Sequence, residues 1–266
     1  MKKKLLAASL AVLLCVMITG CANRTLPTVR YIVHGAGQLD GTNLYGEPKT
    51  FTCSNSAEGL AQCAEAGCRA VEIDFNFTSD GHLVCLHDWY HMYADEIETG
   101  IALTYDEFMK VRIFRHFTPI AVEEVADFLR ENDGVCIVTD IKTDNIAGLT
   151  VIAEQCPDLL DRFVAQIYSA DEYDSVRELG FDNIIFTLYR LPWEEKTDTA
   201  ALAEFAKGHK LAGYTFSSEL CEVDGFVDGM KKTGVPLYVH TVDGEEEQQK
   251  YFDMGIDGIY TNEVLK

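Results

Sequence analysis

The stretch Val71–Asp88, VEIDFNFTSDGHLVCLHD, decides the fold of this chain. Its first half alternates apolar and polar residues, which predicts a strand whose polar face carries Glu72 and Asp74. Ser79–Gly81 predicts a turn, and a second short strand then ends at His87. Two carboxylates on one face repel each other unless a proton or a cation lies between them, and Mg²⁺ or Ca²⁺ prefers such oxygen ligands. The stretch therefore predicts a hairpin that brings two carboxylates and an imidazole together. The alternative is an edge strand with a solvated polar face.

The rest of the chain repeats short apolar strands and helix-length segments without a break in composition. Strands are expected at 29–33, 71–76, 82–86, 135–138, 163–168, 183–188, 211–216, 235–241 and 256–261. If 82–86 folds back as a small β-hairpin insertion, eight parallel strands remain, which predicts a single (β/α)₈ TIM barrel domain over 29–266. An open doubly wound sheet is the alternative. Residues 38–52 are expected to form a polar loop, and Asn55 to cap the helix that follows.

Residues 1–20 have the features of an export signal. Three lysines precede an apolar run, Leu5 to Ile18, which is too short for a typical membrane-spanning helix. The small residues before Cys21 resemble a bacterial lipobox, in which the cysteine is acylated after cleavage. We therefore expect a lipoprotein signal peptide at 1–20, a lipidated tether at 21–28, and an extracytoplasmic protein anchored to the bacterial cell membrane through Cys21. An ordinary signal peptide or an uncleaved anchor is the alternative.

Charge and cysteine content exclude several classes of function. The formal net charge is −21, and loss of the three signal lysines makes it more negative. Nucleic acid is therefore not expected as a partner, because phosphate binding needs a basic surface. Seven cysteines follow Cys21, an odd number that cannot all pair internally, and no C-x-x-C motif suggests zinc or redox chemistry.

Polar residues lie at or near the C-terminal ends of several predicted strands, where the active sites of such barrels are found. His34 ends the first strand, and Asp140 and Lys142 end the strand after the hairpin. Asp140 and the two hairpin carboxylates offer oxygen ligands to a divalent cation, and Lys142 adds a fixed positive charge. His34 and His87 titrate near neutral pH and suit an acid–base pair. This combination suits substrates whose oxygens carry or gain negative charge, and phosphate esters are the obvious class.

Several motifs of the chain resemble those of the glycerophosphodiester phosphodiesterase family. The resemblance covers about residues 30–263, and the order and spacing of the motifs are more specific than any one of them. The motifs are His34-Gly35, Ser54-Asn55-Ser56, Glu72-x-Asp74, Thr78-x-Asp80-Gly81, His87-Asp88, Asp140-x-Lys142, Tyr238–Val242 and Gly255–Ile259.

The resemblance implies a (β/α)₈ barrel of the phosphatidylinositol-phospholipase-C-like phosphodiesterase superfamily. It implies hydrolysis of glycerophosphodiesters to glycerol 3-phosphate and an alcohol with one divalent cation, Mg²⁺ or Ca²⁺. By the same resemblance, the cation ligands are Glu72, Asp74 and Asp140, and the two histidines His34 and His87 are the acid–base pair. Lys142 would contact the phosphate or a metal ligand.

The chain departs from the family at several positions. Gly35 stands where an arginine usually follows the first histidine, and Arg190, at another predicted strand end, is a candidate substitute in substrate binding; a surface loop arginine is the alternative. Asp140 replaces a glutamate, Asn262 replaces an aspartate, and His240 replaces a tryptophan and is also expected to contact substrate. Without the arginine, the chain is also similar to the spider-toxin sphingomyelinase D branch, which often forms a cyclic phosphate.

Three functional hypotheses follow from these features. The first is a lipid-anchored, metal-dependent phosphoric diester hydrolase acting on glycerophosphodiesters or phospholipid headgroups, with either a hydrolysed or a cyclic product. The second is a lipoprotein that binds phosphodiesters without turnover, and the third is a structural lipoprotein with a vestigial pocket. The presence of both histidines and all three carboxylates favours the first hypothesis.

Overall fold

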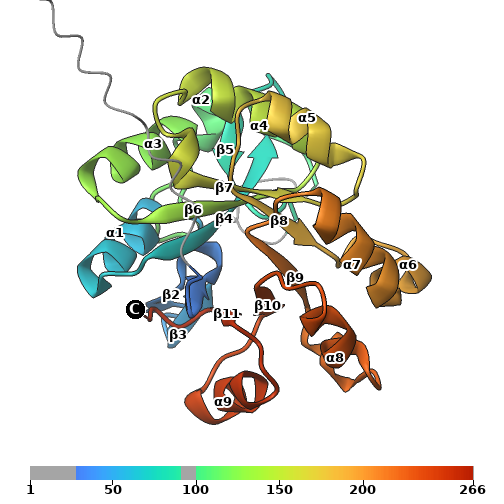
Figure 1. Ribbon diagram of the computed structural model, residues 1–266. Coiled ribbons are helices and arrows are strands. Elements are labelled where there is room, and N and C mark those ends of the chain that lie inside the picture. The colour runs from blue at the N-terminus through green and yellow to red at the C-terminus, as the bar shows by residue number, and fades with distance from the viewer. Residues whose placement is uncertain (1–27, 91–99, 266) are drawn as a thin grey trace, which may run out of the picture.

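Eight parallel strands close into a barrel in this computed structural model, which describes residues 28–90 and 100–265 (Figure 1). The barrel closes because β1 pairs with both β11 and β4. This confirms the predicted (β/α)₈ barrel. The expected signal peptide, Cys21 and all but the last residue of the expected tether lie outside the described residues. The barrel strands are β1 (Tyr31–Val33), β4 (Ala70–Phe77), β6 (Cys136–Ile141), β7 (Phe163–Ile167), β8 (Ile184–Thr187), β9 (Gly213–Ser217), β10 (Leu237–His240) and β11 (Gly258–Thr261).

Helices follow the strands and surround the barrel (Figure 1). None of the helices in the described ranges is long and apolar enough to span a membrane. The α-helices are α1 (Ala57–Ala66), α2 (Tyr105–Phe108), α3 (Val122–Glu131), α4 (Asn145–Gln155), α5 (Glu172–Glu178), α6 (Trp193–Thr197), α7 (Thr199–Gly208), α8 (Phe226–Lys231) and α9 (Glu245–Asp253). The short 3₁₀ helices are η1 (His34–Ala36), η2 (Leu160–Arg162) and η3 (Ser218–Glu222).

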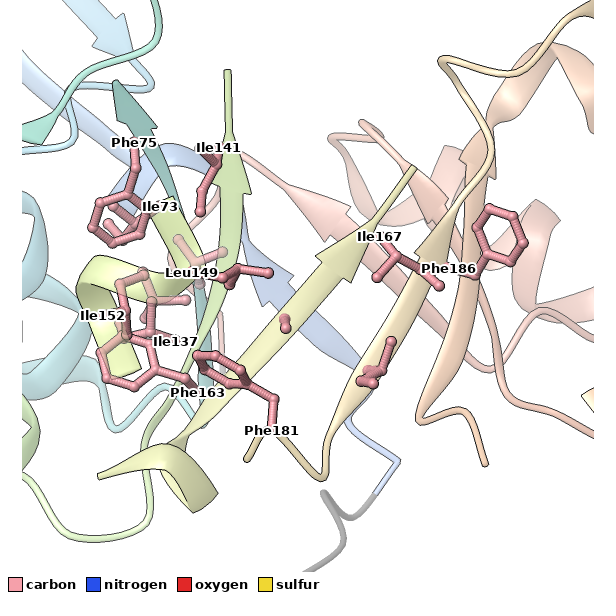
Figure 2. Close-up of a cluster of buried hydrophobic side chains, with 14 of the residues drawn as sticks. Ile73, Phe75, Ile137, Ile141, Leu149, Ile152, Phe163, Ile167, Phe181 and Phe186 are labelled. Atoms are coloured by element: carbon pink, nitrogen blue, oxygen red, sulfur yellow. The ribbon is translucent and has the colours of Figure 1, made fainter. Parts of the chain in front are cut away.

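The main core lies between the outer face of the barrel and the helices. Figure 2 shows Ile73 and Phe75 of β4 in the same apolar cluster as Ile141 of β6 and Leu149 of α4. Each large side chain buried in this way stabilises the fold by about 1.5–3 kcal/mol. Because strand side chains alternate, the outward Val71, Ile73 and Phe75 of β4 leave Glu72 and Asp74 on the opposite face.

Two hairpins extend from the C-terminal side of the barrel. The predicted one is confirmed, because β5 (Leu83–Cys85) pairs antiparallel with β4. His87 follows β5. The second was not predicted: within 38–52, β2 (Gln38–Thr42) pairs antiparallel with β3 (Pro48–Thr52). These strands are mostly exposed and polar, and Phe51 alone among them is buried, in a small second core with Val84, Trp89, Phe108 and Phe117.

Candidate active site

The three predicted ligand carboxylates meet at the C-terminal ends of two adjacent strands. Asp74 of β4 lies in register with Asp140 of β6, and Glu72 precedes Asp74 on the same face. One oxygen from each of the three side chains lies within 4.8 Å of the others, and all three residues are buried. The alternation of β4 therefore brings these residues together as the sequence predicts.

Lys142 lies between two of these carboxylates. Its Nζ is 2.6 Å from Asp74 Oδ1 and 2.8 Å from Asp140 Oδ2. Burial opposes ionisation of Asp74, but Lys142 and His34 outweigh it and hold the pKa of Asp74 below its ordinary value. Burial, followed by the charge of Asp74, raises the pKa of Glu72 well above its ordinary value.

The donor set fits a hard divalent cation. Glu72 Oε2 accepts a hydrogen bond from Gly35 N at 2.7 Å, but Glu72 Oε1 is buried and has no hydrogen-bond partner among the described residues. A buried carboxylate oxygen without a partner is costly. Glu72 Oε1 lies beside two other carboxylates, and a group of carboxylate oxygens is the kind of site that binds Mg²⁺ and Ca²⁺. The cluster can therefore bind a metal ion.

Asn55 belongs to this cluster rather than to the helix cap. The sequence prediction of Asn55 as the N-cap is wrong, because Ser56 caps α1 and accepts a hydrogen bond from Gly59 N at 3.2 Å. Asn55 has a φ of 48° and its side chain points to β4, where Nδ2 donates to Asp74 Oδ2 at 2.8 Å and Oδ1 accepts from Asp74 N at 3.0 Å. Asn55 thus holds both the backbone and the carboxylate of Asp74.

Gly35 takes a backbone conformation that excludes a side chain. Its φ is 55°, and a Cβ atom at this position would lie 2.4 Å from the Cα of Cys53. The Cys53 thiol in turn donates to Asp74 Oδ2 at 2.9 Å. An arginine therefore cannot occupy this position with the same backbone.

Hydrogen bonds define the orientation and tautomer of His34. Asn262 Nδ2 donates to Asp243 Oδ2 at 2.7 Å, because a carboxylate can only accept. The amide oxygen, Asn262 Oδ1, therefore faces His34 Nδ1 at 2.9 Å and acts as an acceptor. Nδ1 of a neutral His34 must therefore carry the proton. Its Nε2 then carries a lone pair and lies 4.0 Å from Glu72 Oε2, at the carboxylate cluster.

His87 approaches the cluster from the hairpin. Leu86 N donates to the Asp74 carbonyl at 2.9 Å, so the next residue, His87, leaves the hairpin beside Asp74. His87 Nδ1 lies 2.7 Å from Asp88 Oδ2, which orients the ring. The side chain is 46% exposed and therefore accessible from the mouth of the barrel.

Asp140 has a second set of partners, and sequence reasoning missed the two tyrosines among them. The hydroxyls of Tyr168 and Tyr189 donate to its carboxylate, and Arg190 Nη2 lies 3.5 Å from Oδ1. The Arg190 guanidinium stacks 3.5 Å over the Tyr168 ring and donates to the Ile141 carbonyl at 2.9 Å. Arg190 therefore lies at the site and not on a remote loop. Tyr168 follows β7 directly and Tyr189 is the second residue after β8, so both lie near strand ends, the same signal that identified Asp140.

Comparison with known proteins identifies the family of this chain. Residues 45–266 match the sequence profile of the Glycerophosphoryl diester phosphodiesterase family. The chain belongs to this family. A glycerophosphodiester phosphodiesterase from Caldanaerobacter subterraneus subsp. tengcongensis is 22% identical over an alignment of 227 residues, which covers 79% of this chain and 88% of that protein.

Solved structures of this family share the fold. A glycerophosphodiester phosphodiesterase from Parabacteroides distasonis has a TM-score of 0.64 and 19% identity, with 88% of this chain and 92% of that chain covered. An Oleispira antarctica phosphodiesterase, solved in complex with the product sn-glycerol-3-phosphate, has a TM-score of 0.64 and 16% identity, with 89% and 93% covered. The predicted enzyme class, a phosphoric diester hydrolase, is confirmed.

His240 lies at the end of β10. It lines the same cavity as His34, Glu72 and Asp140. Burial, with the nearby His34, lowers the pKa of His240 to about 4, so its imidazole is neutral at physiological pH. His240 can therefore exchange hydrogen bonds with a ligand in the cavity without adding charge.

Proposed function

We propose that this chain hydrolyses glycerophosphodiesters to glycerol 3-phosphate and an alcohol, using one divalent cation, Mg²⁺ or Ca²⁺. The observation that carries the proposal is the meeting of three buried carboxylates at one end of the barrel. In this proposal His34 and His87, each oriented by its own hydrogen-bond partner, are the acid–base pair. The Oleispira phosphodiesterase with bound sn-glycerol-3-phosphate supports this choice of substrate by analogy.

The hydrogen-bond partners of the two histidines suggest different roles. His34 donates its Nδ1 proton to a neutral amide, so its Nε2 lone pair is free to take a proton from the attacking water. His87 Nδ1 instead contacts the carboxylate of Asp88, so a hydrogen bond to a carboxylate holds this ring in place of one to an amide. We therefore assign His34 as the general base and His87 as the general acid that protonates the leaving alkoxide.

Positive charge is supplied from three sides in this proposal. A cation bound by Glu72, Asp74 and Asp140 would polarise the phosphoryl oxygens and offset the charge that develops on them. Lys142 keeps its ammonium beside these carboxylates and contacts a phosphate oxygen. Arg190 approaches from β8 and takes the role of the arginine that Gly35 excludes.

We also propose that Cys21 carries the lipid anchor and that the site opens away from the anchoring membrane. Thr28 enters β1 at the N-terminal end of the barrel, whereas the carboxylates lie at the C-terminal ends of the strands. Thr28 follows Cys21 by seven positions, and a chain of that length extends at most about 25 Å. This arrangement favours water-soluble glycerophosphodiesters as substrates. Lipid labelling of the wild-type protein and of Cys21→Ser in cells tests the anchor, and equal labelling would contradict it.

The experiment for the proposed activity measures glycerol 3-phosphate released from glycerophosphocholine. EDTA should abolish release, and Mg²⁺ or Ca²⁺ should restore it. A cyclic phosphate as the product would favour the sphingomyelinase-D-like alternative. Ligand binding without turnover would favour the non-catalytic binding protein and would refute the proposal.

A further inference from the structure

Two cysteines are in contact where α1 ends. Cys63 lies in the last turn of the helix, and Cys68 is the second residue after it. Both are thiols in this structure, both are buried, and the two thiols hydrogen-bond to each other. Both side chains belong to the apolar core outside the barrel, and neither belongs to the carboxylate cluster. The pair is therefore a group of nucleophilic side chains that the proposed reaction does not use.

The backbone at the end of α1 fixes this contact. Gly67 has a φ of 75° and a ψ of 34°, the left-handed conformation that commonly ends a helix. Cys68 N donates to the Cys63 carbonyl at 2.9 Å, and Gly67 N donates to the Ala64 carbonyl at 3.0 Å. These two hydrogen bonds form a Schellman motif, which brings the residue after the glycine back onto the last turn of the helix. An apolar contact frequently forms at this point, and here two thiols meet.

The geometry of the pair meets the requirements of a disulfide. Such a bond forms without backbone movement when the two Cα atoms lie within about 7 Å and the side chains point toward each other. Standard bond lengths on either side of the 2.9 Å hydrogen bond from Cys68 N to Cys63 O place the two Cα atoms at most about 7 Å apart. The hydrogen bond between the thiols shows that the side chains face each other.

Burial decides when such a bond can form. The hydrogen bond to Cys68, together with burial, raises the pKa of the Cys63 thiol, so the folded protein holds very little of the reactive thiolate. Oxidation therefore has to take place while the chain folds, when both thiols are still accessible. The export signal expected at residues 1–20 would place this step outside the cytoplasm, where disulfides form and persist.

We propose that Cys63 and Cys68 form a disulfide as the exported chain folds. This inference goes beyond the proposed phosphodiesterase activity and rests on the proposed export, not on the reaction. One thiolate attacks the disulfide of an oxidant, either a thiol–disulfide oxidoreductase or glutathione disulfide, and forms a mixed disulfide. The second thiolate then displaces the thiol of the oxidant. Two S–H bonds break and one S–S bond forms, and the oxidant takes up two electrons and two protons as it becomes two thiols.

The disulfide would fix the connection between α1 and β4. It closes a loop of six residues, Cys63 through Cys68, just before the strand that carries Glu72 and Asp74. The reduced chain entropy of the unfolded state predicts that Tm rises by about 4–9 °C in a domain of this size. Activity on glycerophosphocholine should be the same in both redox states, because neither thiol belongs to the active site. Failure of the disulfide and failure of the proposed activity are therefore separate results.

One tryptic peptide gives the redox state of the pair. Cleavage after Lys49 and Arg69 releases residues 50–69, which also contain Cys53 as an internal reference thiol. The full-length protein from bacterial cells is denatured in N-ethylmaleimide, then reduced, treated with iodoacetamide and analysed by mass spectrometry. We expect N-ethylmaleimide on Cys53 and the iodoacetamide product on Cys63 and Cys68. N-ethylmaleimide on either member of the pair would overturn the proposal.

Refolding of the purified protein shows which premise is wrong if the pair is reduced in cells. Refolding with glutathione disulfide should give a Tm about 4–9 °C above that of protein refolded with a reductant. Cys63→Ala and Cys68→Ala should each abolish this difference, whereas Cys156→Ala, which removes another buried thiol, should retain it. A wild-type pair that stays reduced in this buffer would contradict the geometric argument. A pair that forms here but is reduced in cells would contradict oxidation during export.

Discussion

Replacement of Lys142 by methionine should destabilise the metal-free protein and make it more responsive to metal. The Lys142 ammonium is close to both Asp74 Oδ1 and Asp140 Oδ2, and its side chain is only 16% exposed. Removing one partner of a buried ion pair costs about 3–5 kcal/mol, because the remaining charges are left uncompensated. For a domain of this size, that loss lowers Tm by about 6–20 °C.

A divalent cation at the same carboxylates should reverse most of this loss. The assay is thermal unfolding of wild type and Lys142→Met in EDTA and with added Mg²⁺ or Ca²⁺. The metal-induced rise in Tm should be larger for the variant, because the cation replaces the missing charge as well as binding its own ligands. Lys207→Met is the control, since Lys207 pairs with Glu204 on the open surface and should show little change.

Two results would refute this reasoning. A Lys142→Met protein as stable as wild type in EDTA would mean that Lys142 does not compensate the cluster. An equal rise in Tm on metal addition in both proteins would mean that the cation does not bind at the Asp74 and Asp140 oxygens.

Four further predictions concern single residues of the site. Burial raises the pKa of Glu72, so the metal-free fold loses stability as pH rises through that pKa and the side chain ionises. Glu72→Gln cannot ionise, so in EDTA it should become more stable than wild type as pH increases, as urea unfolding would show. The same variant should lose metal-dependent activity. In a steady-state assay, His87→Ala should lose about 10²–10⁴-fold in kcat on glycerophosphocholine. Its kcat on a p-nitrophenyl phosphodiester should fall much less, because that leaving group needs no general acid. His34→Ala should lose kcat by a similar factor on both substrates. Asn262→Leu should reduce kcat and change the ¹⁵N NMR tautomer pattern of His34 without a comparable loss of Tm; an unchanged pattern would count against the assignment of His34. Gly35→Ala should lower the free energy of unfolding by more than about 1–2 kcal/mol, the cost of a left-handed backbone alone, because its Cβ also overlaps the neighbouring loop; denaturant titration giving a smaller loss would contradict this.

The sequence predicted the features that depend on strand periodicity. Alternation in β4 places Glu72 and Asp74 on one face, and the short segment after the turn at Gly81 forms the expected antiparallel strand. Asp140 and Lys142 follow from the same rule in the next barrel strand. These features could be predicted because each depends on a pattern within a few residues and on the rule that places barrel sites at strand C-termini.

The missed features depend on contacts between distant parts of the chain. Asn55 has the residue type of an N-cap, and only its contact with Asp74, 19 residues away, shows its other role. Asn262 orients His34 across 228 residues, through an amide whose direction is set by Asp243. The β2–β3 hairpin lacks an alternating apolar face, so its sequence resembles that of a loop.

Phosphorus NMR of the purified protein with glycerophosphocholine tests the central claim most directly. Spectra are recorded with Mg²⁺, with Ca²⁺ and with EDTA. We predict that the diester signal is replaced by that of a monoester, glycerol 3-phosphate, only when a divalent cation is present. A cyclic diester as the final product, turnover in EDTA, or a diester signal that persists under every condition would contradict the account.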